Sequence, residues 1–251
     1  MLVVCPLGGR RGARVRELAA DAGIDLDVIE IAQETRGTYT VVDDCKGALI
    51  EILEPPPALS ASEICAFAAR ALARADAPVV ITSGSLPTGL ADCFHAEIAR
   101  AATGTCVVDA SGRALAEALC EPRALVTPNR DELSEATGAA TSGLERGELA
   151  DLIRAPSWVS LGADGSVFSP SADERWQLAL AAPGAAVNSV GCGDALVGGY
   201  AAGIALGLSP LDAAALGVAA AASKLTHLHP AAIDPAHTRA LAGTVTRQRI
   251  A

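Results

Sequence analysis

The order of hydrophobic and polar residues predicts strands that alternate with helices along most of the chain. A short buried strand is expected at 2–5, a helix with apolar residues at helical spacing at 10–22, and a second strand at 26–31. Further on, strands are predicted at 79–83, 106–109 and 125–127, and helices at 61–75, 90–102, 112–120 and 131–137. The remaining predictions are strands at 157–161, 166–169 and 176–180, and three helices that finish the chain. Such alternation is typical of an α/β protein with a parallel sheet.

The pattern changes between residues 35 and 54. Two β-prone runs, 38–42 and 48–53, flank the sequence D-D-C-K-G at 43–47, which is typical of a hairpin turn. Three prolines end this segment, and Ser60 with Glu63 predicts a capping box at the start of the next helix. We therefore expect one domain over 1–251, with an antiparallel β flap over 35–54 inside it.

The stretch that carries most chemistry is V-N-S-V-G-C-G-D-A-L-V-G-G, at 187–199. Glycines allow backbone N–H groups to turn toward a ligand, and the start of the small-residue helix predicted to reach Gly207 adds unpaired N–H groups. Together they predict an anion site. The alternative is that Asp194 only caps the helix. Gly198, Gly199 and Gly203 each cost about 1 kcal/mol relative to alanine inside a helix, so we expect this helix to pack closely against another element.

Residues Asn188 to Gly199 resemble the second signature of the PfkB (ribokinase-like) carbohydrate kinases, N-T-V-G-A-G-D-x-x-x-x-G, with Ser189 and Cys192 as small replacements. The resemblance implies a ribokinase-like three-layer α/β/α fold with a mostly parallel sheet. It also implies ATP and Mg²⁺ as cofactors. In the family the glycine turn binds the phosphoryl group during its transfer, and an aspartate takes the proton from the attacking sugar hydroxyl. The corresponding residues of this chain are Gly191, Cys192 and Gly193 for the turn and Asp194 for the aspartate.

Two further segments resemble the nucleotide side of these kinases. The sequence T-P-N-R-D-E-L at 127–133 is similar to K-P-N-x-x-E-L, which implies that Asn129 and Glu132 help to organise Mg²⁺ and the phosphates, while Thr127 replaces the lysine. The strand and turn at 159–165 imply that three residues lie against the nucleotide: Ser160, Gly162 and Gly165. The alternatives are an asparagine turn followed by an ordinary helical glutamate, and a plain hairpin turn.

Resemblance on the sugar side is to the phosphofructokinase and tagatose-6-phosphate kinase branch. The loop S-G-S-L-P-T-G at 83–89 is similar to its S-G-S-L-P-P-G. The sequence E-T-R at 34–36 implies that Arg36 contacts the phosphate already on the sugar, the alternative being an exposed arginine before a strand. The alignment also leads us to expect an N-terminally truncated member, without the family's first strand, part of its lid and its G-G-K-G-x-N loop.

Charge, hydropathy and cysteine spacing argue against some classes of binding partner. A formal net charge of −10 over 251 residues argues against a nucleic-acid surface. The chain has no leader-like start and no apolar run long enough to span a bilayer, so we expect no membrane partner and a cytoplasmic protein. Its seven cysteines are scattered singly, which predicts buried thiols for most of them and no zinc site.

Three functions remain open on the sequence. The first is a kinase of a sugar or sugar phosphate. The second is a phosphatase with the same fold, in which Asp194 positions water for hydrolysis of a sugar phosphate. The third is a non-catalytic protein that binds a nucleotide or sugar phosphate. Exposed edges of the flap favour pairing, which predicts a homodimer through the β flap. The sequence does not identify the sugar.

Overall fold

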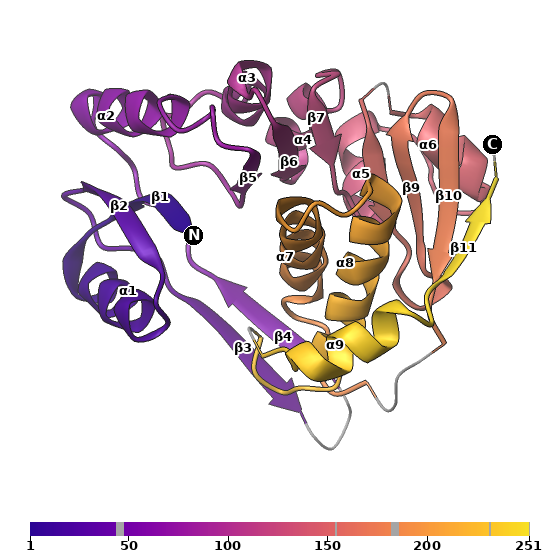
Figure 1. Ribbon diagram of the computed structural model, residues 1–251. Coiled ribbons are helices and arrows are strands. Elements are labelled where there is room, and N and C mark those ends of the chain that lie inside the picture. The colour runs from indigo at the N-terminus through magenta and orange to yellow at the C-terminus, as the bar shows by residue number, and fades with distance from the viewer. Residues whose placement is uncertain (44–47, 154, 182–185, 231, 251) are drawn as a thin grey trace. The chain divides into compact units, whose positions relative to one another are not determined.

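The computed structural model describes residues 1–43, 48–153, 155–181, 186–230 and 232–250, and the chain forms two compact units (Figure 1). Unit 1 comprises Met1–Arg74 and Ser85–Phe94, and unit 2 comprises Ala75–Gly84 and His95–Ala251. We describe each unit by itself. A single domain over 1–251 therefore stays a prediction.

Unit 1 begins with β1 (Leu2–Leu7), α1 (Gly9–Asp21) and β2 (Asp25–Glu30), and β1 pairs in parallel with β2. Its α2 (Ala61–Leu72) starts with the predicted capping box, because the Ser60 side chain accepts from the Glu63 amide and the Glu63 side chain accepts from the Ser60 amide. The prediction that the first strand is buried is wrong, since Leu7 is its one buried residue. The physical reason is that β1 has a single strand neighbour, β2, within the described residues.

The predicted flap is an antiparallel hairpin of β3 (Thr38–Asp43) and β4 (Ala48–Leu53). Its predicted turn at 44–47 lies outside the described residues. Tyr39 pairs with Ile52 and Val41 pairs with Ile50, and directly opposed residues share one face of a hairpin. All four side chains on this face are at least half exposed, from 50% to 57%. We call these four residues the apolar flap face.

Unit 2 is built on one seven-stranded sheet in the order β11-β10-β9-β8-β7-β6-β5. Its strands are β5 (Val79–Ser83), β6 (Thr105–Asp109), β7 (Ala124–Val126), β8 (Ser157–Ser160), β9 (Ser166–Ser171), β10 (Glu174–Ala179) and β11 (Thr246–Arg249). The helices are α3 (Phe94–Ala101), α4 (Gly112–Ala118), α5 (Arg130–Thr137), α6 (Arg146–Asp151), α7 (Cys192–Ala205), α8 (Pro210–Leu225) and α9 (Pro235–Ala242). Strands β5 to β8 pair in parallel, and β9 to β11 add antiparallel pairs so that β10 runs in the direction of β8.

Both faces of this sheet are covered. Val107 of β6 packs in the cluster that includes α7 and α8, and Val108, which points to the opposite face, is also fully buried. Helix α4 contacts β6 and β7, and α6 contacts β8 and β9. Unit 2 therefore has the expected three-layer α/β/α arrangement.

Helices α7 and α8 lie side by side in unit 2, as expected from the glycines of α7 (Figure 1). A Cβ atom on Gly199 would lie 2.9 Å from the Ala220 Cβ, and one on Gly203 would lie 2.8 Å from the Ala213 Cβ. These two glycines allow close helix packing. A Cβ on Gly198 would instead meet open space, so this glycine takes no part in the close packing.

Several further details differ from the sequence predictions. The short helix α6 was not predicted. The edge strand β11, which follows the last helix, was not predicted either, because its four residues, T-R-Q-R, carry no apolar alternation. Among the described cysteines only Cys106 is buried, so the prediction of mostly buried thiols is wrong. No helix among the described residues is long and apolar enough to cross a membrane.

Candidate phosphoryl-transfer site

A left-handed glycine starts α7. Gly191 is the N-cap with φ 84° and ψ 4°, a conformation that favours glycine. A Cβ atom there would lie 2.4 Å from the Pro230 carbonyl oxygen. Asp194 stands in the first turn of α7, but no side-chain hydrogen bond caps this helix. The alternative that Asp194 serves as an N-cap is therefore wrong.

The amides of this turn are not all available. The Cys192 amide donates to the Ser189 carbonyl at 3.1 Å, and the Ala195 amide makes the first helical bond, to the Gly191 carbonyl at 3.0 Å. Among the described residues, the amides of Gly191, Gly193 and Asp194 donate no hydrogen bond. The structure thus corrects the expectation for Cys192, whose amide is used inside the turn, and adds the Asp194 amide to the open donors.

The segment before the turn is held by its own side chain. Asn188 is 4% exposed, and its Nδ2 donates to the Leu228 carbonyl at 2.7 Å while its Oδ1 accepts from the Val190 amide at 2.9 Å. The Val187 amide donates to the Leu225 carbonyl at 2.9 Å. These bonds fix the segment to the end of α8 and to the residues that follow it.

Asp109, at the end of β6, lies beside this turn and was not among the predicted site residues. Its carboxylate accepts from the Thr127 hydroxyl at 3.2 Å and from the Ser83 hydroxyl at 3.2 Å. Burial raises the pKa of Asp109, the two hydroxyls oppose that rise, and the negative charge of Asp194 adds to it. The available signal was a polar residue at the carboxyl end of a parallel strand, where ligands of such sheets bind.

Asn129 and Glu132 form a capping box at the start of α5. The Glu132 amide donates to Asn129 Oδ1 at 2.8 Å, and the Asn129 amide donates to Glu132 Oε2 at 2.8 Å. Burial raises the pKa of Glu132, the Asn129 amide opposes that rise, and the charge of Asp109 adds to it. This pair therefore has a structural role, and its role toward Mg²⁺ and the phosphates stays a prediction. One Glu132 oxygen takes no part in the box.

The predicted nucleotide turn follows β8 directly. Ser160 forms a β-bridge with Asn129, which brings these two predicted residues together. Gly162 is exposed and has φ 59°, and it opens the 3-10 turn η1 (Gly162–Asp164) between β8 and β9. Gly165 closes that turn with φ 85°, where a Cβ would lie 2.3 Å from the Leu178 carbonyl oxygen.

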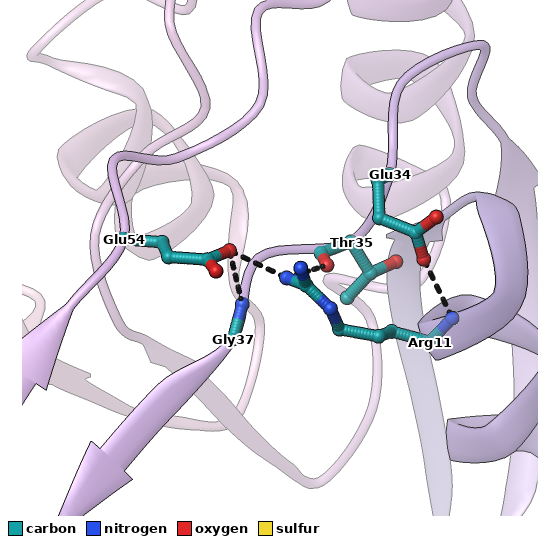
Figure 2. A network of polar contacts seen from close by, with 5 residues as sticks. All are labelled: Arg11, Glu34, Thr35, Gly37 and Glu54. Carbon is teal, nitrogen blue, oxygen red and sulfur yellow. Dashed lines mark hydrogen bonds and ion pairs between the residues drawn. The ribbon is translucent and has the colours of Figure 1, made fainter.

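Arg36 belongs to unit 1 and lies in the loop between β2 and β3. The loop is fixed on both sides of it (Figure 2): the Thr35 carbonyl accepts from Arg11 Nη1 at 3.0 Å, and the Gly37 amide donates to Glu54 Oε2 at 2.9 Å. Arg11 also forms an ion pair with Glu54, and its amide donates to Glu34. Arg36 itself is half-buried and makes no hydrogen bond or ion pair with the described residues. Its position relative to Asp194 is not defined, because the two residues belong to different units.

The described residues contain no group of three His, Cys, Asp or Glu side chains arranged to hold a metal ion. Magnesium usually takes one or two carboxylates and completes its shell with water and substrate phosphates. Asp109 and Glu132, whose charges repel each other in partly buried positions, fit such an ion.

Comparison with known proteins decides the family. The model of the pfkB family carbohydrate kinases matches residues 1–237. The chain belongs to the pfkB family of carbohydrate kinases. This pfkB kinase chain is 31% identical over 237 residues to ATP-dependent 6-phosphofructokinase isozyme 2 of Mycobacterium tuberculosis, covering 88% of this chain and 67% of that protein. It is 28% identical over 220 residues to the 1-phosphofructokinase of Bacillus subtilis, covering 84% of this chain and 71% of that protein.

Structural comparison agrees with this assignment. A crystal structure of phosphofructokinase-2 from Escherichia coli, in complex with potassium, superposes with a TM-score of 0.84 at 25% identity, covering 96% of this chain and 81% of that one. The chain spans about two thirds of the length of the M. tuberculosis relative. The roles of the individual site residues stay predictions.

Proposed function

We propose that this pfkB chain is an ATP- and Mg²⁺-dependent kinase that phosphorylates a hydroxyl group of a sugar phosphate. The observation that carries the proposal is the turn at the start of α7, where three amides without internal partners lie next to an aspartate without a hydrogen-bond partner among the described residues. The relatives named as phosphofructokinases support the choice of a sugar phosphate over a free sugar.

In the proposed reaction, the hydroxyl oxygen of the sugar phosphate attacks the γ-phosphorus of ATP. Asp194 accepts the hydroxyl proton as the new O–P bond forms and the bond to the leaving ADP oxygen breaks. The amides of Gly191, Gly193 and Asp194 donate to the phosphoryl oxygens, where charge is spread in the transition state. Positioning and electrostatic stabilisation together are most of phosphoryl-transfer catalysis.

Mg²⁺ would be held on the side of Asp109 and Glu132, with Asn129, Ser160, Gly162 and Gly165 near the nucleotide. A bound Mg²⁺ neutralises charge on the phosphates. The chain's own contribution is carboxylate charge: burial and mutual repulsion disfavour the ionised forms of Asp109 and Glu132, and a cation relieves that repulsion.

Arg36 would bind the phosphate that the substrate already carries. A guanidinium presents its N–H groups in a planar fork that matches a phosphate. The backbone on both sides of Arg36 is hydrogen-bonded, so little backbone entropy is lost when its side chain engages a ligand.

We also propose that the apolar flap face contacts the same face of a second copy. A two-stranded hairpin is marginally stable alone, and one surface pairs with itself in a twofold dimer. One E. coli phosphofructokinase-2 structure is described as a tetrameric inhibited form. We expect Val41→Glu to shift the protein toward monomer in sedimentation velocity, while Thr40→Glu, one residue away on the other hairpin face, leaves the distribution unchanged. A wild-type monomer at all concentrations would contradict this part.

The function is tested by incubating the protein with Mg²⁺ and a panel of sugars and sugar phosphates, with and without ATP, and following ADP and inorganic phosphate. We expect ADP that depends on a sugar phosphate. Phosphate released without ATP would favour the phosphatase, and ligand binding without turnover would favour the non-catalytic protein.

Asp194→Asn should lower kcat about 1,000-fold, because the variant cannot accept the hydroxyl proton. The matched control is Asp173→Asn, an exposed aspartate in the turn before β10, which should keep wild-type kcat and the same far-UV circular dichroism. Full turnover by Asp194→Asn would exclude Asp194 as the base.

A further inference from the structure

Lys224 is buried behind the turn at Gly191–Asp194, which we call the phosphoryl-binding turn. It is one of two lysines in the chain, the other being Lys46, and its side chain is fully buried in the last turn of α8. Within the described residues it pairs with no carboxylate. Its ammonium donates to the Asn188 carbonyl at 2.8 Å and to the His227 carbonyl at 3.1 Å. Burial of a charge is costly unless hydrogen bonds compensate it, so this position requires an explanation.

The two carbonyls belong to two segments that meet at the turn. Asn188 precedes the turn, and His227 follows α8. The same two segments are joined by the Asn188 side chain, which donates to the Leu228 carbonyl, and by the close approach of Gly191 to Pro230. Lys224 therefore takes one carbonyl from each segment and links them.

A lysine in the last turn of a helix often does no more than interact with that helix's own carbonyl ends. Here both bonded carbonyls lie outside α8, which ends at Leu225. The positive charge of Lys224 also acts on the turn itself. Burial raises the pKa of the Cys192 thiol, and the charge of Lys224 opposes that rise.

We propose that Lys224 is a positioning residue of the phosphoryl-binding turn. Its ammonium holds the Asn188 and His227 carbonyls together, which keeps the amides of Gly191, Gly193 and Asp194 open to a phosphoryl group, and it places a positive charge behind them. This inference rests on the proposed function for what the turn binds. A compact ammonium suits carbonyls that converge from two segments, whereas the planar fork of arginine does not.

The first test needs no turnover. Amide signals of Gly191, Gly193 and Asp194 are followed by NMR during titration with inorganic phosphate in wild-type protein, Lys224→Met and Ser223→Ala. Ser223 is the matched control, because it is a fully buried neighbour whose hydroxyl accepts from the Asp234 amide and does not contact the turn. We expect phosphate to bind these amides about tenfold or more weakly in Lys224→Met and with wild-type affinity in Ser223→Ala.

A measurement on the wild-type protein covers the case in which Lys224→Met does not fold. With ¹⁵N-labelled lysine, the chain has two side-chain ammonium groups, and the Lys224 signal should shift on phosphate addition with the same dissociation constant as the Gly193 amide. A Lys224 signal that ignores phosphate, or wild-type phosphate affinity in Lys224→Met, would overturn the proposal even if the protein proved to be a kinase.

The second test uses kinetics. Lys224→Met should lower kcat about 100-fold with an unchanged KM for the sugar phosphate, because the loss falls on the amides that act in the transition state. Ser223→Ala should keep wild-type kcat. Unchanged kcat in Lys224→Met would overturn the inference and leave the proposed function intact, whereas an inactive wild-type protein with phosphate-responsive amides would overturn the proposed function alone.

Discussion

The two candidate phosphate-binding regions are built from different groups. The turn at the start of α7 offers backbone amides, and its conformation depends on a left-handed glycine and on a lysine buried behind it. The Arg36 loop of unit 1 offers a single side chain, and what is fixed there is the backbone on both sides of it. Backbone donors are set in place by the fold and cannot move away without unfolding the turn. A side-chain donor is held by its neighbours and loses rotamer freedom only when it binds.

The two regions also differ in their electrostatics. Beside the α7 turn, burial raises the pKa of Asp109, and the negative charge of Asp194 adds to that rise. In the Arg36 loop, Glu54 accepts from the Gly37 amide and pairs with Arg11, and both interactions lower its pKa (Figure 2). Ionised carboxylates therefore stabilise the second region and destabilise the first until a cation or a proton arrives.

The largest expected effect is on the backbone-built region. Gly191→Ala should lower the free energy of unfolding by about 2–4 kcal/mol, because alanine is strained in the left-handed region and its Cβ overlaps the Pro230 carbonyl. The control is Gly198→Ala in the same helix, whose Cβ meets open space, and it should gain up to about 1 kcal/mol. Urea unfolding of the two variants measures both. Equal stability for Gly191→Ala and wild type would show that the turn does not need its glycine.

A smaller effect is expected for the side-chain region. Arg36→Ala should raise the KM for the sugar phosphate about 30-fold, as expected from losing a hydrogen bond between charged groups, and should change kcat less. Because the neighbouring backbone is fixed by other residues, the unfolding free energy should be unchanged. Arg10→Ala, at an exposed arginine of α1, serves as the control and should keep the wild-type KM. If both variants raise KM equally, the effect is one of overall charge and not of a specific site.

The smallest effect is a difference in pH dependence between the regions. Asp109 has a folded pKa above its ordinary value of 3.8, so its contribution to stability decreases as pH rises from that value through the folded pKa. Glu54 has a folded pKa below its ordinary value of 4.5, so its contribution is present above that value and is lost as pH falls through the folded pKa. At neutral pH, Asp109→Asn should therefore raise stability and Glu54→Gln should lower it. Unfolding measured from acidic to neutral pH tests the signs, and two changes of the same sign would remove the contrast.

Much of the local structure could be predicted from the sequence. The capping box of Ser60 with Glu63 joins groups three residues apart, so the residue types alone indicate it. The glycine turn was predicted for the same reason, since a left-handed position in a short turn strongly favours glycine. Predictions for the amides were less complete, because whether Cys192 donates to Ser189 depends on the exact path of the turn.

What the sequence by itself determined is the alternation of strands and helices and the residues that start and end them, because these follow from periodicity and from contacts within about four residues. The resemblance of its motifs, above all 188–199, indicated the family. Only the tertiary structure decided which distant groups meet. It placed the Lys224 ammonium on the Asn188 carbonyl 36 residues away, and Asp109 against the Thr127 hydroxyl 18 residues away. The physical reason is that a buried charge or hydroxyl takes whichever partner the packed elements bring to it, and no local pattern records that partner.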